Sequence, residues 1–207
     1  MDLKNLIEPH LDLKRLGKTL DELGHPARVW ATRQWTRDIQ AKLYEAVKGF
    51  RPVSLADYVP EGTAPLTEVR TWGMNTLPAH NHFQKRFCKP GGGATDRLIG
   101  FNYQGLSGFT GPGYYVAHPA GEAGEVDVDY TMAPTPTDGK PATWPDIMPN
   151  SARLGRFVYY GMVDVMRGIS AHVSIGRARK KHGWMDAWFV LVREDPQQTD
   201  PALAAQA

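Results

Sequence analysis

Residues 125–132 read Glu-Val-Asp-Val-Asp-Tyr-Thr-Met, and this alternation of polar with apolar side chains decides the fold class. Successive side chains of a β-strand point to opposite faces, so the apolar residues of this stretch share one face and the polar residues the other. One buried face and one hydrated face are typical of an antiparallel sheet. The stretch therefore predicts a half-buried antiparallel strand.

Other stretches of the C-terminal two-thirds have strand patterns of the same kind. The further candidate strands are residues 98–103, 114–118, 157–178 and 184–193. Within residues 157–178, Gly161 and Gly168 are interpreted as bulges, or Arg167 and Gly168 as a turn between two strands. Six or more such strands favour a strongly curved antiparallel sheet or a β-barrel, because closure removes exposed edges. An open sheet covered by helices is the alternative.

The N-terminal quarter has a different period. Leu13, Leu16 and Leu20 recur every three or four residues, and Gly24 is placed to end that helix. Pro26 can begin a second helix, in which apolar residues recur every four positions between residues 35 and 47. Each helix has one apolar face, so each is expected to pack against a larger element.

These patterns together predict an α+β fold, with two N-terminal helices packed on a strongly curved antiparallel β-sheet or β-barrel. We expect a single domain over residues 1–194, made of a helical segment (3–50) and a sheet segment (66–194). Residues 195–207 are rich in Pro, Gln and Ala and are expected to form a flexible tail.

Composition excludes several classes of protein. The 207 residues carry 24 Lys and Arg against 22 Asp and Glu, a formal net charge of +2 that argues against a nucleic-acid partner. The sequence has no apolar run long enough to span a membrane and no secretory leader, so a soluble, cytoplasmic protein is expected. The sequence leaves open whether the protein forms a homo-oligomer. The basic residues gathered in 177–182 are interpreted as a solvated hairpin tip, with contact to an anionic ligand as the alternative.

Aromatic residues concentrate in the sheet segment. Rings and hydroxyls among apolar residues are typical of small-molecule cavities. The first functional hypothesis is therefore a carrier or ligand-binding protein that holds a small, largely apolar or aromatic molecule inside the sheet. The predicted ligand-binding residues are Trp72, Tyr103, Tyr114, Trp144 and Tyr160. Residues 133–150 contain five prolines and are interpreted as a lid or binding loop, or as an ordinary surface connection.

The second hypothesis is a cofactor-independent cyclase, isomerase or lyase that works by acid–base chemistry in the same cavity. Asp164 lies between two methionines on its face of the strand, so an inward orientation would desolvate its carboxylate and require a partner. His172, Arg167 or a tyrosine could be that partner, and His172 or His80 could act as the base. An outward Asp164 on a half-buried strand is the alternative.

The third hypothesis is a metal site at His80 and His82. On a strand this spacing places both imidazoles on one face. A third ligand would come from another strand, with His118, His172, Asp127 and Asp129 as candidates. Solvated or structural histidines are the alternative, and the sequence identifies no cofactor.

Overall fold

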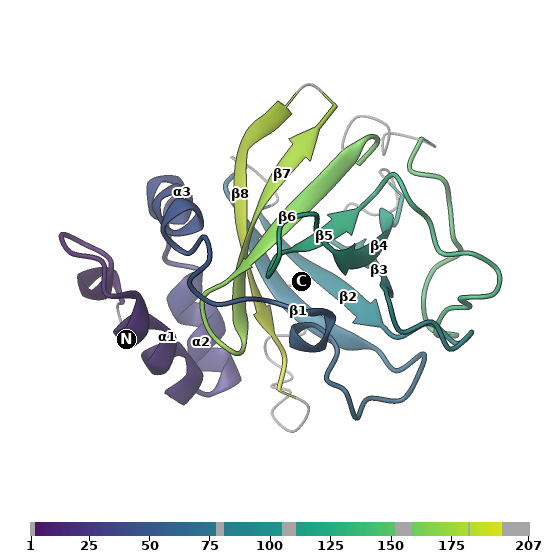
Figure 1. Ribbon diagram of the computed structural model, residues 1–207, viewed down its shortest axis with the longest axis horizontal. Helices are drawn as coiled ribbons and strands as arrows, with labels where there is room; N and C mark the ends of the chain where they lie inside the picture. Colours follow the sequence, from purple (N-terminus) through teal and green to yellow (C-terminus); the bar gives the residue numbers. More distant parts are fainter. Residues whose placement is uncertain (1–2, 78–80, 105–110, 152–158, 182, 196–207) are drawn as a thin grey trace.

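The chain forms a closed barrel of eight antiparallel strands with helices packed on its outside (Figure 1). The computed structural model describes residues 3–77, 81–104, 111–151, 159–181 and 183–195. The helices are η1 (Lys4–Leu6), α1 (Leu13–Glu22), α2 (His25–Thr32), α3 (Arg37–Ala46) and η2 (Leu55–Asp57). The strands are β1 (Val69–Asn75), β2 (His82–Cys88), β3 (Leu98–Tyr103), β4 (Tyr114–Pro119), β5 (Val126–Asp129), β6 (Met162–Gly168), β7 (Val173–Lys180) and β8 (Gly183–Arg193).

Each strand pairs with the next one along the chain, and β1 pairs with β8 to close the ring. Gly73 of β1, for example, lies opposite Phe83 of β2 on one side and Leu191 of β8 on the other. The predicted α+β fold with a barrel is therefore confirmed, and the alternative of an open sheet is wrong. Within the predicted stretch 157–178, of which 157 and 158 lie outside the described residues, β6 and β7 are joined by a turn at residues 169–172, and Arg167 and Gly168 end β6.

The second predicted helix is in fact two helices. α2 ends at Thr32, and α3 begins at Arg37 after Thr36, whose hydroxyl accepts a hydrogen bond from the Ile39 N–H at 3.4 Å. Trp35, between them, is buried in the core. The apolar spacing over residues 35–47 continues across the break between the two helices. The chain changes direction there because Thr36 caps α3 and the Trp35 ring is buried.

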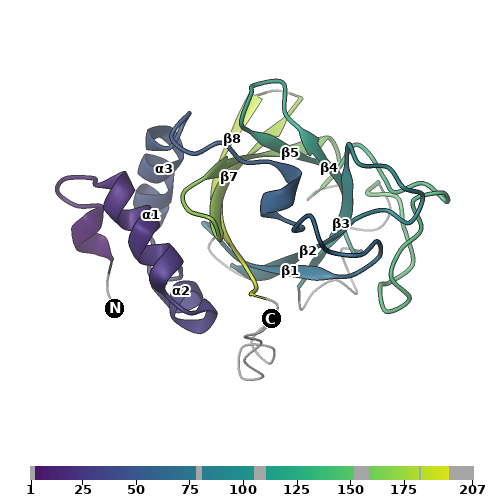
Figure 2. The ribbon, with the colours of Figure 1, turned by 60° about the horizontal axis from the view of Figure 1, so that its bottom comes forward.

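The helices lie beside β7 and β8 on the outer face of the barrel (Figures 1 and 2). Apolar side chains that point outward from these strands, such as Ile175 and Val190, form one core with Leu16, Leu20 and Leu43 of the helices. The apolar helix faces therefore cover a sheet face that would otherwise be exposed. Within the described ranges, no helix is long and apolar enough to cross a bilayer.

One end of the barrel is closed by η2, which sits inside the ring of strands in Figure 2. A capping box forms between Ser54 and Asp57, and Arg51 holds the Asp57 carboxylate at 2.6 Å. Tyr58 and Val59 follow η2 and pack with the side chains inside the barrel. The η2 end is thus a fixed part of the core.

Candidate functional site: a buried lysine–aspartate cluster and the groove beside η2

Asp164 points into the barrel. Its cross-strand neighbour Val128 belongs to the interior core, whereas the next residue, Val165, pairs with Asp127 on the outer face. The Asp164 side chain is 4% exposed. The structure thus selects the inward orientation, and the required partner is Lys85 of β2, not one of the predicted ones.

The Lys85 ammonium has three oxygen neighbours inside the barrel. Nζ lies 2.9 Å from Asp164 Oδ2 and 3.2 Å from Asn102 Oδ1, and it also donates to the Tyr130 hydroxyl. Asn102 Nδ2 donates to the same hydroxyl at 2.7 Å. These four residues form the Lys85 cluster, in which each donor of the ammonium has an acceptor.

Aromatic rings enclose the Lys85 cluster. Lys85 Nζ lies 4.8–5.7 Å from the ring centroids of Phe83, Tyr115, Tyr130 and Phe189. The negative faces of such rings attract a cation, and the interaction strengthens when water is excluded. The ammonium is thus held both by hydrogen bonds and by the rings.

Burial shifts the acid–base properties of the cluster. It lowers the pKa of the Lys85 ammonium below its ordinary value, and the neighbouring Asp164 carboxylate acts in the opposite direction. Burial, reinforced by Asp164, raises the pKa of Tyr130 well above its ordinary value. A charge pair in an apolar interior costs more desolvation free energy than it commonly returns. Such perturbed groups are candidates for function.

Large side chains inside the barrel pack closely against glycines of neighbouring strands. A Cβ added at Gly176 would lie 2.3 Å from the Phe189 ring and 2.6 Å from Met166 Sδ, and one at Gly100 would lie 2.4 Å from the Tyr115 ring. Large rings therefore pack directly over glycines of the neighbouring strand. Tyr115 and Met166 are fully buried, so the interior of the barrel is tightly packed beside these glycines.

Four of the five predicted ligand-binding aromatics lie on the outside of the barrel. Trp72 is buried beneath the helices, beside His25. Tyr114 and Trp144 pack together on the outer face with Phe101, so the loop of residues 133–150 covers that face. Tyr103 stacks against the Arg86 guanidinium. Strand alternation turns Trp72, Tyr103 and Tyr114 outward, and Trp144 lies in the loop that covers the outer face.

Tyr160, the fifth predicted aromatic, is 64% exposed. It lines a second groove, near the barrel end away from η2, together with residues such as Met132 and Lys181.

His172 lies in the turn between β6 and β7, at the η2 end. Its Nδ1 is 2.9 Å from Asp195 Oδ1, and Arg193 donates to the same nitrogen at 3.3 Å. Burial, with the nearby Arg28 charge, lowers the pKa of His172. The ring belongs to an ion-pair group that joins the end of β8 to the helices, so the structure does not bring His172 together with Asp164.

The predicted metal site is described only in part. His82 begins β2 with an exposed side chain, while His80 lies outside the described residues. No group of three His, Cys, Asp or Glu side chains within the described ranges could hold a metal ion. Metal binding through His80 and His82 stays a prediction.

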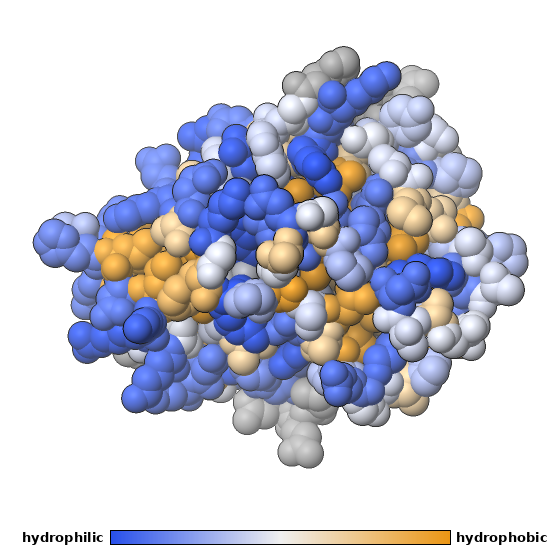
Figure 3. All heavy atoms as spheres, viewed as in Figure 1, coloured by the Kyte–Doolittle hydropathy of each residue, from blue (hydrophilic) through white to orange (hydrophobic). Residues whose placement is uncertain are grey.

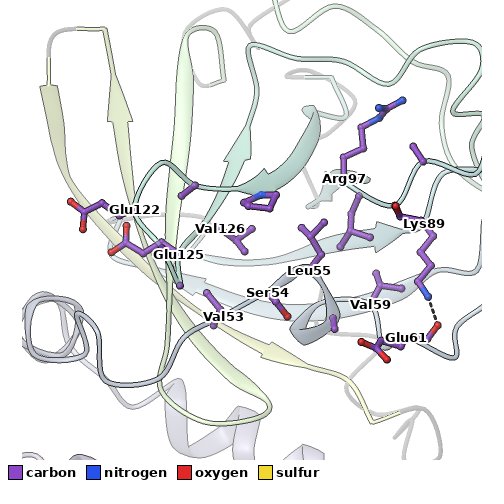
Figure 4. Close-up of a pocket in the computed structure, with 18 residues that line it drawn as sticks. Val53, Ser54, Leu55, Val59, Glu61, Lys89, Arg97, Glu122, Glu125 and Val126 are labelled. Carbon is purple, nitrogen blue, oxygen red and sulfur yellow. Dashed lines mark hydrogen bonds between the residues drawn. The ribbon is translucent and has the colours of Figure 1, made fainter.

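A groove of about 580 Å³ lies beside η2, between this helix and the β2–β3 and β4–β5 loops (Figure 4). We call it the η2 groove. Val53, Leu55 and Val126 occupy its middle. Glu122 and Glu125 lie on one side, and Arg97, Lys89 and Glu61 lie on the other. Figure 3 shows apolar residues at the surface in the middle of this face, surrounded by hydrophilic ones.

Four of the five charged residues that line the η2 groove have partners in the protein. Arg97 binds the Asp138 carboxylate at 2.6 Å, and Lys89 donates to the backbone carbonyl of Glu61. Glu125 accepts from Arg167 at 2.6 Å, and exposed Glu122 pairs with Lys48. The apolar floor is consequently the part of the groove that can take up a ligand.

Sequence reasoning missed Lys85 and the η2 groove. Lys85 stands in a charged run, Gln84-Lys85-Arg86, which is typical of a solvated segment. The alternation Phe83, Lys85, Phe87 was the available signal, since it places the lysine on the same face as two buried rings. The groove carries no such signal, because three segments far apart in the sequence build it.

Comparison of the chain with protein-family models, with curated proteins and with solved structures finds no match. The function of the protein is therefore inferred from the geometry of its sites.

Proposed function

We propose that the protein binds a small, largely apolar or aromatic molecule, and that the η2 groove is its binding site. The observation that carries the proposal is a groove of about 580 Å³ with an apolar floor and with rim charges most of which already have partners. This volume lies within the usual range of roughly 300–1,000 Å³ for small-molecule sites. A ligand without charge gains from the floor and leaves the rim ion pairs intact.

The rigidity of the walls supports the same proposal. The capping box of Ser54 and Asp57 fixes η2, and Val53 N–H donates to the carbonyl of Gly124 at 2.9 Å, which ties the η2 segment to the β4–β5 loop. Val59, Leu98 and Val126 belong to or adjoin the barrel core with at most 2% exposure. A preformed apolar site loses little conformational entropy on binding.

The test uses N-phenyl-1-naphthylamine, an uncharged aromatic probe whose fluorescence rises in apolar sites. Ala123 is an exposed residue that lines the groove, so Ala123→Trp should fill part of it without disturbing the core. We expect saturable binding that weakens at least tenfold in this variant. Ala27→Trp, an exposed position of α2, is the matched control and should bind as the parent does. Equal binding by both variants, or no saturable binding, would refute the proposal.

A second candidate function is proton-transfer catalysis at the Lys85 cluster. The contact between Lys85 Nζ and the Tyr130 hydroxyl, beside Asp164, favours it, because an amine whose pKa is lowered by burial is a candidate general base. This retains the acid–base chemistry expected of Asp164 but replaces histidine with lysine and Tyr130.

Titration of the Lys85 side chain by nuclear magnetic resonance tests the catalytic candidate without a substrate. An acid–base role calls for a Lys85 pKa of about 7–8, near the working pH. An ammonium that stays protonated above pH 10 would instead assign Lys85 to a structural ion pair.

A further inference from the structure

The groove that contains Tyr160 differs in charge from the η2 groove. It has a volume of about 870 Å³ and lies at the barrel end away from η2, where it is lined by Val163 of β6, the end of β7 and residues 130–133, 149–151 and 160–161. We call it the outer groove. Its charged lining residues are Arg179, Lys180 and Lys181, and none of the described lining residues is an acid.

The walls of the outer groove are tied to the barrel. Asn150 Nδ2 donates to the backbone carbonyls of Tyr114 and Tyr130 at 2.7 and 2.8 Å, which holds the Pro149–Ser151 wall against β4 and the end of β5. Arg179 is fixed by Asp127 Oδ2 at 2.7 Å, and this ion pair offsets part of its charge. Lys181, an exposed residue just after β7, brings a further positive charge to the groove.

Apolar surface lies next to this charge. Tyr160 is 64% exposed and Met132 is 45% exposed, and both line the groove. Exposed rings and thioethers that share one concave site with cations are suited to a ligand with an apolar arm and a negative head. The basic residues Arg179, Lys180 and Lys181 thus meet an apolar wall that their sequence position does not indicate.

We propose that the outer groove is a second binding site, separate from the η2 groove, for a small soluble amphipathic anion: an aromatic or alkyl group that bears a carboxylate, sulfonate or phosphate. Lys181 attracts the anionic head, and Tyr160 and Met132 contact the apolar arm. At physiological salt the Debye length is roughly 8 Å, so the attraction acts on a ligand within the groove and weakens as salt is added.

A pair of related probes separates the two sites. 1-Anilinonaphthalene-8-sulfonate has the ring system of N-phenyl-1-naphthylamine plus one sulfonate. We expect Lys181→Glu to weaken binding of the sulfonate probe about tenfold and to leave the uncharged probe unaffected. Tyr160→Ala should weaken the sulfonate probe as well. Lys14→Glu makes the same charge change at an exposed position of α1 and should have no effect.

Three results would overturn the proposal. The first is equal sulfonate binding by Lys181→Glu and Lys14→Glu. The second is loss of sulfonate binding in Ala123→Trp with none in Lys181→Glu, which would place that probe in the η2 groove. The third is Lys181-dependent binding to phosphatidylglycerol vesicles without saturable binding of the free probe, which would assign the surface to a membrane. If the η2 groove binds no ligand, saturable binding is missing for the uncharged probe alone. The two proposals can therefore fail independently.

Discussion

Lys85 Nζ and Asp164 Oδ2 lie 2.9 Å apart inside the barrel, and each side chain is less than 5% exposed. Neither charge has water to solvate it, so each depends on the other. Removing one partner of such a pair leaves a buried charge, whereas replacing both with apolar residues often costs little.

We therefore expect Lys85→Met and Asp164→Leu each to lower the free energy of unfolding by about 3–5 kcal/mol. The double variant should recover most of that loss. Urea unfolding of the four proteins at pH 7 provides the double-mutant cycle. Additive losses in the double variant would contradict the interdependence of the two charges.

Protonation of His25 should destabilise the fold in mild acid. Burial lowers the pKa of this ring from 6.5 to about 4, so between these values the unfolded chain binds a proton that the folded chain does not. The contribution of His25 to the free energy of unfolding is therefore constant above pH 6.5. It falls by about 3 kcal/mol as the pH falls toward 4. Urea unfolding across this range should show a smaller pH slope in His25→Phe than in the parent. His10→Phe, at an exposed position, should retain the parent slope.

Trp144 should matter for stability and not for ligand binding. Its ring packs against Phe101 at 4.9 Å on the outer face, and its Nε1 donates to Glu68 Oε2 at 2.7 Å. We expect Trp144→Ala to cost about 3–5 kcal/mol, as for other buried aromatics. Binding of N-phenyl-1-naphthylamine below the melting temperature should stay within twofold of the parent. A tenfold loss of probe binding with unchanged stability would instead restore Trp144 as a ligand contact.

Gly176 should tolerate no side chain. Because a Cβ there would meet the Phe189 ring at 2.3 Å, Gly176→Ala is expected to cost about 1–3 kcal/mol through overpacking. Phe189→Leu should relieve part of that cost when the two changes are combined. Gly62→Ala, where a Cβ would meet nothing within 4 Å, is the control in thermal unfolding. Equal melting temperatures for the two alanine variants would show that the barrel centre can relax.

Much of the fold could be predicted from local pattern. The alternation at Val126 and Val128 and the apolar spacing from Leu13 to Leu20 correspond to β5 and α1 because each pattern reflects one buried face of one element. The break between α2 and α3 was missed, since apolar spacing persists across it.

The candidate sites were less predictable, because alternation separates two faces without saying which one is inside. In β6, the face with Asp164 and Met166 is interior, while the Val163 and Val165 face is outside. The predicted ligand-binding aromatics were expected inside the barrel because rings are typical of ligand cavities. Most of them lie on its outer face instead.

The sequence by itself indicated the type of many elements, because side-chain period and chain-reversing glycines act over a few residues. β1 and β2 were not among the candidate strands. Only the tertiary structure decided which side of each strand is enclosed, that Lys85 meets Asp164, and that η2 and two loops form a groove. These outcomes depend on ring closure between β1 and β8 and on helices covering the neighbouring outer face. Such long-range contacts decide which of the two faces of a strand becomes the interior, because the local pattern is the same for both.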